Sequence, residues 1–181
     1  MFLNANEPKL LTALNLDVIY GQVSFKDTQD QSDQNPIIAL SASYDALAIS
    51  PELSYSLESS GSNVIAALQV SKIFSQLLSD MQQYSSSSSS GNNFKYDLLF
   101  VLTPSGSLNH EATSKYVEHL PSSLKDRIKL VLCLDTIVSS LNSKELYLLQ
   151  GHLTTSGEAE KLVQDFTSEL KRAAAQKDVQ I

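Results

Sequence analysis

Two aspartates and one short turn are the features of this sequence with the residue types and spacing that chemistry needs. Asp45, the turn Pro104-Ser105-Gly106 and Asp135 each follow a short apolar run. Ligands and catalytic groups in α/β sheets gather at the carboxyl ends of strands, so all three would lie on one rim of a sheet. Two carboxylates there could bind a metal ion or work as an acid–base pair. Aspartates at strand-to-loop turns also commonly accept backbone N–H bonds, and this alternative stays open.

The other reactive side chains add little to such a site. A two-metal hydrolytic centre needs several histidine and carboxylate ligands and a glutamate that activates water. We expect His110, His119 and His152 to be exposed or capping residues, since none ends a predicted central strand. Ser105 lies between proline and glycine, but the G-x-S-x-G spacing of a nucleophile elbow is absent. Cys133 lies inside an apolar run and is expected to be a buried small hydrophobe.

The hydrophobic pattern predicts the elements that would position these residues. Short β-branched and apolar runs bounded by turn residues predict buried strands over 36–45, 94–103 and 128–135. Weaker patterns predict an antiparallel, near-edge strand over 15–25 and a further strand over 144–150. Apolar residues at helical spacing predict helices over 62–84, 109–120 and 155–173. Strands alternating with helices predict an α/β fold, a three-layer αβα sandwich with a mostly parallel, mixed sheet.

Local signals add detail at the ends and faces of the helices. Asn109 is placed to cap the second helix, and Thr155 with Glu158 forms a capping box for the third. The serine-rich residues 85–91 predict a flexible loop. In the first helix, the stripe predicted to face the sheet is Ala66, Val70, Ile73, Phe74, Leu77, Leu78 and Met81.

Composition limits the class of protein. A length of 181 residues suits one domain with a sizeable core, and the net charge of −7 argues against binding to nucleic acid. The first residues lack the pattern of a signal peptide, and no window approaches the ~18 apolar residues of a membrane span. Residues 178–181 begin like another strand, so we expect residues 1–181 to be a single domain truncated at its C-terminus, with an open sheet edge there.

Four segments, in order and spacing, resemble the zinc-dependent aminopeptidase family M28. Residues 39–45 resemble its first metal motif, in which a ligand histidine comes two residues before a catalytic aspartate. Residues 56–64 resemble the stretch that opens the following helix. Residues 100–106 and 131–136 match the strands that in peptidases end in Glu-Glu-x-Gly and in a ligand aspartate. The resemblance implies a peptidase-like fold with its site on the predicted rim.

Position by position, the chain departs from the catalytic pattern of that family. Ser43 stands where the ligand histidine is expected, and Ser59 where the bridging aspartate is expected. The pair Pro104-Ser105 replaces the general-base and ligand glutamates, and only Asp45 and Asp135 keep the family's residue type, as relics. The resemblance therefore implies no catalytic residue, no bound metal and no cofactor, because such a site can neither hold two zinc ions nor activate water.

Within this superfamily the chain looks like the non-catalytic nicastrin and nicalin branch. The segments that carry the likeness are 43–46, 98–100, 113–118 and 132–136, and the resemblance covers roughly residues 16–181. Nicalin-type proteins are single-pass endoplasmic reticulum membrane proteins with this domain in the lumen. The resemblance implies a scaffold or binding domain with protein partners, a Nodal modulator-type protein and a small multi-pass membrane subunit. Their assembly works with the translocon on multi-pass membrane protein biogenesis.

Two alternatives stay open beside that role. One is a nicastrin-like receptor that uses the old substrate cleft to sense protein termini in an intramembrane protease complex. The other is a residual hydrolase or aminopeptidase in which Asp45 and Asp135 hold one metal ion. A metal-dependent enzyme has to bind a divalent ion, whereas a scaffold does not.

Overall fold

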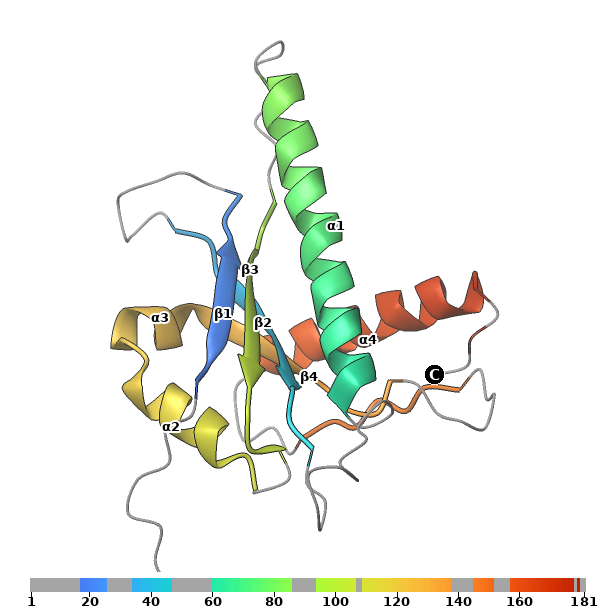
Figure 1. Cartoon of the computed structure of the whole chain (residues 1–181). Coiled ribbons are helices and arrows are strands. Elements are labelled where there is room, and N and C mark those ends of the chain that lie inside the picture. Colours follow the sequence, from blue (N-terminus) through green and yellow to red (C-terminus); the bar gives the residue numbers. More distant parts are fainter. Residues whose placement is uncertain are drawn as a thin grey trace, which may run out of the picture.

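A four-stranded mixed sheet in the order β1-β3-β2-β4 forms the centre of the protein (Figure 1). The computed structural model describes residues 17–25, 34–46, 60–85, 94–106, 109–137, 145–151, 157–177 and 179. Strand β2 pairs in parallel with both β3 and β4, and β1 pairs antiparallel with β3. This confirms the predicted α/β fold and mostly parallel sheet. The strands are β1 Ile19–Val23, β2 Ile37–Ser43, β3 Asp97–Thr103 and β4 Ile128–Leu134.

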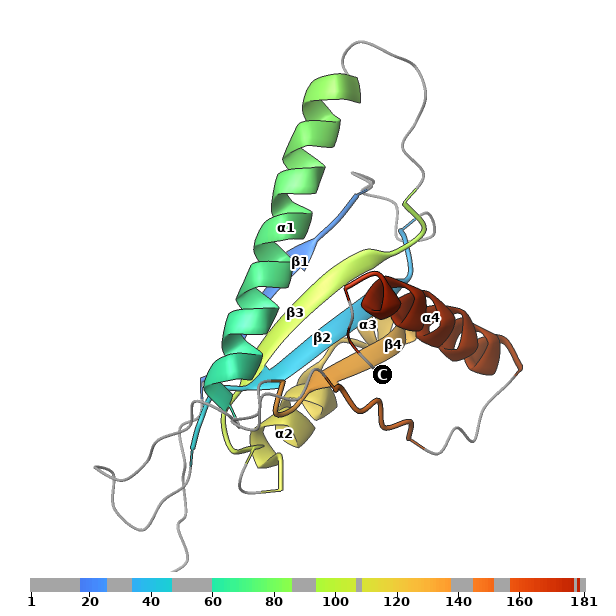
Figure 2. The same cartoon turned by 90° about the vertical axis from the view of Figure 1, so that its right-hand side faces the viewer.

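Helices cover both faces of the sheet. In Figures 1 and 2, α1 and α4 lie on one side of the sheet and α2 and α3 on the other. Their bounds are α1 Ser62–Ser85, α2 Glu111–His119, α3 Ser122–Arg127 and α4 Gly157–Ala175. None of the helices described by the structure combines the length and apolarity needed to cross a bilayer.

The core forms two layers because successive residues of a strand point to opposite faces. Toward α1, a buried cluster contains Leu40, Ala42 and Phe100 together with Ala67 of the helix. Toward α2 and α3, the second cluster contains Ile37, Ala39, Leu99 and Val101. Strands β2 and β3 are therefore buried on both faces, which explains their continuous apolar sequence.

Helix α1 confirms the predicted helix but buries a narrower stripe than predicted. Ala67, Val70 and Leu78 pack on the sheet, whereas Ile73 and Leu77 are exposed. The helix has 24 residues, about 36 Å, whereas a strand of seven residues spans only about 23 Å. Its C-terminal end consequently projects beyond the strands (Figure 1).

Strand β4 corrects two predictions. The sequence predicted that β4 and its residue Cys133 would be buried. Instead, β4 lies at the edge of the described sheet. Its alternate residues Val131 and Cys133 are exposed. In the part of the chain that the structure describes, β4 pairs only with β2. One face of β4 is therefore partly covered, and the opposite face is open to solvent.

Two further predictions are wrong. Residues 145–151 do not form a strand, since only Glu145 makes an isolated bridge, and Tyr147 and Leu149 are almost fully exposed. The cap of α2 is His110 rather than Asn109, because both residues have a left-handed backbone and the helix begins one residue later. Thr155 and the side chain of Glu158, which were predicted to form a capping box, lie outside the described part of the chain, as do residues 86–91 of the serine-rich stretch. Of residues 178–181, where a strand was expected, only Val179 is described, and it has no strand assignment.

A buried ion pair joins the chain segments at one end of the sheet, where β2 and β3 begin and β1 ends. Asp97, the first residue of β3, accepts a bond from Arg127 Nη2 at 2.8 Å and from the backbone N–H of Phe25 at 3.1 Å. Asn35 Nδ2 also donates to Asp97, at 3.3 Å, and Arg127 Nε donates to the carbonyl of Asn35 at 2.9 Å. The cluster joins the ends of β1 and α3 to the starts of β2 and β3.

Candidate functional site

The carboxyl ends of β2, β3 and β4 form the predicted rim. Because β2 is parallel to both neighbours, Asp45, the Pro104-Ser105-Gly106 turn and Asp135 follow strands that end on the same side of the sheet. Ser43 is the register partner of Thr103, and Ala42 that of Leu134. The sequence therefore located this region correctly.

Asp45 is occupied by backbone hydrogen bonds. Its Oδ2 accepts the N–H of Ser105 at 2.7 Å, and its Oδ1 accepts the N–H of Gly106 at 3.0 Å. Bonds from N–H groups to an ionised carboxylate are stronger than bonds between neutral groups. This geometry confirms the alternative interpretation of Asp45, in which it accepts backbone N–H bonds at a strand-to-loop turn. The residue clamps the turn after β3 to the end of β2.

Gly106 closes the same turn on β2. A Cβ atom at Gly106 would lie 2.7 Å from Ser43 Cβ and 3.5 Å from Asp45 Oδ1, which leaves no room for a larger side chain. Ser43, at the position of the expected ligand histidine, is half-buried against this glycine. The space beside Asp45 is therefore filled by the turn itself.

Ser105 serves the backbone rather than a substrate. It is buried and has a left-handed backbone, with φ of 64°. Its Oγ accepts the N–H of Ala112 at 2.8 Å, and its carbonyl accepts the N–H of His110 at 3.0 Å. These bonds join the turn to the first residues of α2. Among the described residues, no histidine ring forms a hydrogen bond with the Ser105 hydroxyl.

Asp135 has different partners from Asp45. It is exposed directly after β4, and Thr136 Oγ1 donates to its Oδ1 at 3.2 Å. The N–H of Ile137 donates to Oδ1 of the buried Asn63 at 3.2 Å, which fixes the end of this segment to the start of α1. No hydrogen bond joins the Asp45 and Asp135 side chains. Within the described ranges, no three His, Cys, Asp or Glu side chains form a group that could hold a metal ion.

The histidines that the structure describes lie outside this centre. His110 is an exposed cap residue without a side-chain capping bond, and His119 Nδ1 lies 2.7 Å from the carbonyl of Lys115. Both confirm the prediction of exposed or capping roles. His152 and Ser59 are outside the described residues.

Cys133 is exposed on β4, but its thiol is not activated. Partial burial raises the pKa of the thiol, and the neighbouring charge of Asp135 raises it further. Because the thiolate is the nucleophilic form, this residue is a poor nucleophile at neutral pH.

The sequence did not predict several polar contacts that connect the elements of the carboxyl-end rim. Thr103 and Thr113 hydroxyls lie 2.8 Å apart and connect β3 to α2. Asn63 directly follows a serine at the start of a predicted helix, a polar pair that could have drawn attention. Nothing in the local sequence shows that Thr103 and Thr113 meet, since this depends on how α2 packs. The carboxyl-end rim is thus joined by internal hydrogen bonds.

Comparison with known proteins gives a consistent set of relatives, although no family model matches the chain. A zebrafish (Danio rerio) protein named BOS complex subunit ncln is 36% identical over 112 residues, which are 59% of this chain and 18% of that protein. Its human counterpart is 34% identical over 107 residues, 56% of this chain and 17% of that protein, and the chicken (Gallus gallus) counterpart is 32% identical over 107 residues. The chain thus spans less than a fifth of the length of these curated relatives. Over the matched region it is similar to nicalin.

Proposed function

We propose that this chain is a non-catalytic scaffold or binding domain of a nicalin-like subunit. The subunit would support an endoplasmic reticulum membrane complex that works with the translocon on multi-pass membrane protein biogenesis. The observation that carries the proposal is the similarity to several vertebrate proteins named as BOS complex subunits. The name of those relatives describes a component of a complex, which fits a domain that contributes a binding surface.

The domain in this proposal is a degenerate peptidase of the M28 type. Ser43, Ser59 and the pair Pro104-Ser105 replace the ligand and general-base positions that the family resemblance assigns. The packing of the rim supports a non-catalytic role, because both Asp45 oxygens accept backbone N–H groups and Gly106 fills the space beside Ser43. A metal ion at Asp45 would have to compete with these two bonds.

In this proposal, residues 1–181 belong to a single domain. That domain lies on the luminal side of the membrane. Its expected partners are a Nodal modulator-type protein and a small multi-pass membrane subunit. The net charge of −7 is consistent with protein partners rather than nucleic acid.

Affinity capture of the intact native protein from detergent-solubilised membranes tests the role in a complex. We expect mass spectrometry to recover the Nodal modulator-type protein and translocon components. Recovery of presenilin-type protease subunits instead would favour the nicastrin-like receptor. Recovery of neither set would overturn the proposed function.

A thermal shift experiment tests the non-catalytic half of the proposal. A divalent ion that binds the folded state raises the Tm as its concentration exceeds its Kd. We expect saturating zinc to leave the Tm of the purified chain unchanged. A rise in Tm that is lost in Asp45→Asn would show that the relic site binds metal, and would support the hydrolase.

A further inference from the structure

Strand β4 contains one residue more than the stretch of β2 beside it. Ile128 is the register partner of Ile37, but Leu130 is the partner of Ile38, so the register skips Lys129. From Leu130 onward the pairing with β2 is regular again. One extra residue opposite a regular strand is a β-bulge, which is rare between parallel strands and is a specified feature of a fold rather than a defect.

The bulge divides the apolar residues of β4 between the two faces of the sheet. In a regular strand, Ile128, Leu132 and Leu134 would share one face, because their spacing is even. In the structure, Ile128 packs on the cluster toward α2 and α3, whereas Leu132 and Leu134 pack on the cluster toward α1. Lys129 between them is exposed, and its Nζ donates to the carbonyl of Asp126 at 2.7 Å. The strand therefore changes face at Lys129.

The start of β4 is fixed by Arg127, the last residue of α3. Its guanidinium donates to Asp97 Oδ2 at 2.8 Å, to Gln34 Oε1 at 2.7 Å and to the carbonyl of Asn35 at 2.9 Å. The three acceptors belong to β3 and to the segment that leads into β2. A guanidinium is a rigid, planar fork of donors, so these bonds define its position closely. A shift of β4 by one residue, about 3.3 Å, would break all of them.

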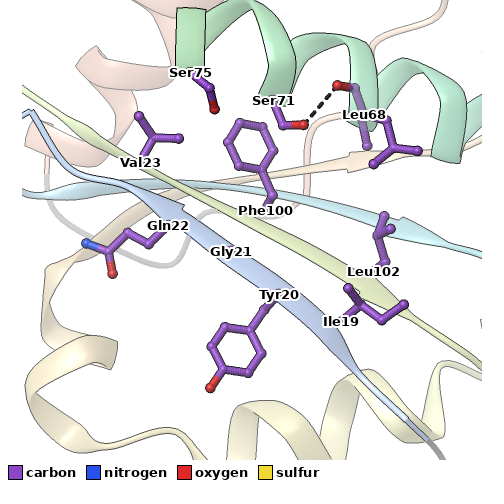
Figure 3. A pocket seen from close by; sticks show the side chains of 11 residues that line it. Ile19, Tyr20, Gly21, Gln22, Val23, Leu68, Ser71, Ser75, Phe100 and Leu102 are labelled. Atoms are coloured by element: carbon purple, nitrogen blue, oxygen red, sulfur yellow. Dashed lines mark hydrogen bonds between the residues drawn. The ribbon is translucent and has the colours of Figure 1, made fainter. Parts of the chain in front are cut away.

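The rest of β4 is fixed separately, by its apolar stripe Leu132 and Leu134. Both leucines pack on the cluster toward α1. Val23 and Phe100 of this cluster are seen beneath α1 in Figure 3, at the pocket between β1 and α1. Val131 and Cys133 alternate with the leucines and are exposed. A slip of one residue would exchange the two faces and turn the leucines away from this cluster.

We propose that β4 is held in register by two independent anchors, Arg127 at its start and the apolar stripe in the rest of the strand. Lys129 is the surplus residue, and it stays out of the pairing so that both anchors hold at once. The two anchors together decide which face of β4, that of Val131 and Cys133, is exposed. This inference concerns how the sheet is specified and does not rest on the proposed function.

Deletion of Lys129 tests the inference, and deletion of Val131 is a control of the same length. Without Lys129, the residues on either side of it can pair with β2 without a bulge, so we expect the Tm of the purified chain to stay within about 4 °C of the wild type. Without Val131, regular pairing would place the Lys129 ammonium opposite Ile38, on the face toward α1. We expect this control to lower the Tm by at least about 8 °C. An equal loss in both variants, or failure of both to fold, would overturn the inference.

A double-mutant cycle tests the anchor at Arg127. If the guanidinium still bonds Asp97 after Lys129 is deleted, Asp97→Asn lowers the Tm equally in the deletion variant and in the wild type. A clearly smaller loss in the deletion variant would mean that Arg127 had moved away from Asp97. That result would overturn the claim that Arg127 sets the start of β4.

A cross-link tests the anchor at the apolar stripe. Ser41 and Cys133 are register partners, and Cys133 is the single cysteine of the sequence. In Ser41→Cys, a short bifunctional thiol reagent therefore joins this pair alone within one chain. We expect mass spectrometry to find the intramolecular cross-link equally with Lys129 present and with Lys129 deleted. Its loss on deletion would show that residues 130–134 had shifted by one residue, which turns Cys133 to the other face and overturns the inference.

Discussion

The Asp97–Arg127 ion pair provides the sharpest test of what holds the sheet together. Asp97→Asn keeps the size of the side chain and removes the negative charge that Arg127 Nη2 contacts at 2.8 Å. The two side chains are only 3% and 18% exposed, so Arg127 would be left as a poorly solvated charge. Removing one partner of a buried pair costs about 3–5 kcal/mol. Arg127 keeps its bonds to Asn35 O and Gln34 Oε1, so we expect the lower end, about 3 kcal/mol.

Urea denaturation followed by circular dichroism measures this loss as a lower free energy of unfolding. The control is Glu111→Gln, which breaks the pair with Lys115, whose two side chains are 61% and 59% exposed. We expect less than about 0.5 kcal/mol from the control, as for exposed i,i+4 pairs. Adding Arg127→Met to Asp97→Asn should restore part of the loss, because it removes the orphaned charge. If Asp97→Asn stays within about 1 kcal/mol of the wild type, the reasoning about burial is refuted.

Three further outcomes are expected at the carboxyl-end rim and on β4. Asp45→Ala removes the acceptor of two backbone N–H groups and should lower the free energy of unfolding by about 2 kcal/mol in the same urea assay, and an unchanged value would contradict the clamp. Gly106→Ala should cost about 1–3 kcal/mol through its collision with Ser43, and adding Ser43→Gly should restore most of the loss if that contact is the cause. The raised pKa of Cys133 predicts that iodoacetamide alkylates it more slowly at pH 7 than a free cysteine, with a rate that climbs as the pH rises through the thiol pKa. Asp135→Asn should speed this alkylation at pH 7, and a rate independent of Asp135 would argue against its electrostatic effect.

The strands with neighbours on both sides were predictable from sequence, and those at the edges less so. In β2 and β3, continuous apolar runs indicated burial on two faces, and the structure confirms it. In β4, the run 128–134 looks the same in sequence, yet Val131 is exposed. A local pattern records which residues tolerate burial, but it cannot show whether another strand lies alongside. The same limit explains the wrong strand prediction over 144–150.

The common rim at the carboxyl ends of the strands was predicted correctly, but the contacts within it were only partly predictable. The rule that functional groups follow parallel strands brought Asp45 and Gly106 to one region. Turn chemistry also suggested that an aspartate there accepts backbone N–H groups. The close approach of Gly106 to Ser43 was not foreseeable, because these residues are far apart in sequence and meet only through the β2–β3 register.

The strand order has a consequence for how the chain folds as it is made. Strands β1 and β2 are consecutive in sequence but are not neighbours in the order β1-β3-β2-β4, and in the described sheet both of them pair with β3. A ribosome therefore has to add roughly 80 residues after Val23 before β3 is complete at Thr103, a delay of about 4–16 s at 5–20 residues per second. Strand β2 ends at Ser43, so for the last 60 of these residues, from Ser43 to Thr103, this apolar strand has been made without its partners. The nascent chain thus needs protection from aggregation before its sheet can form, because the release of β3 covers one edge of β2 and the other edge stays open until β4 is complete at Leu134.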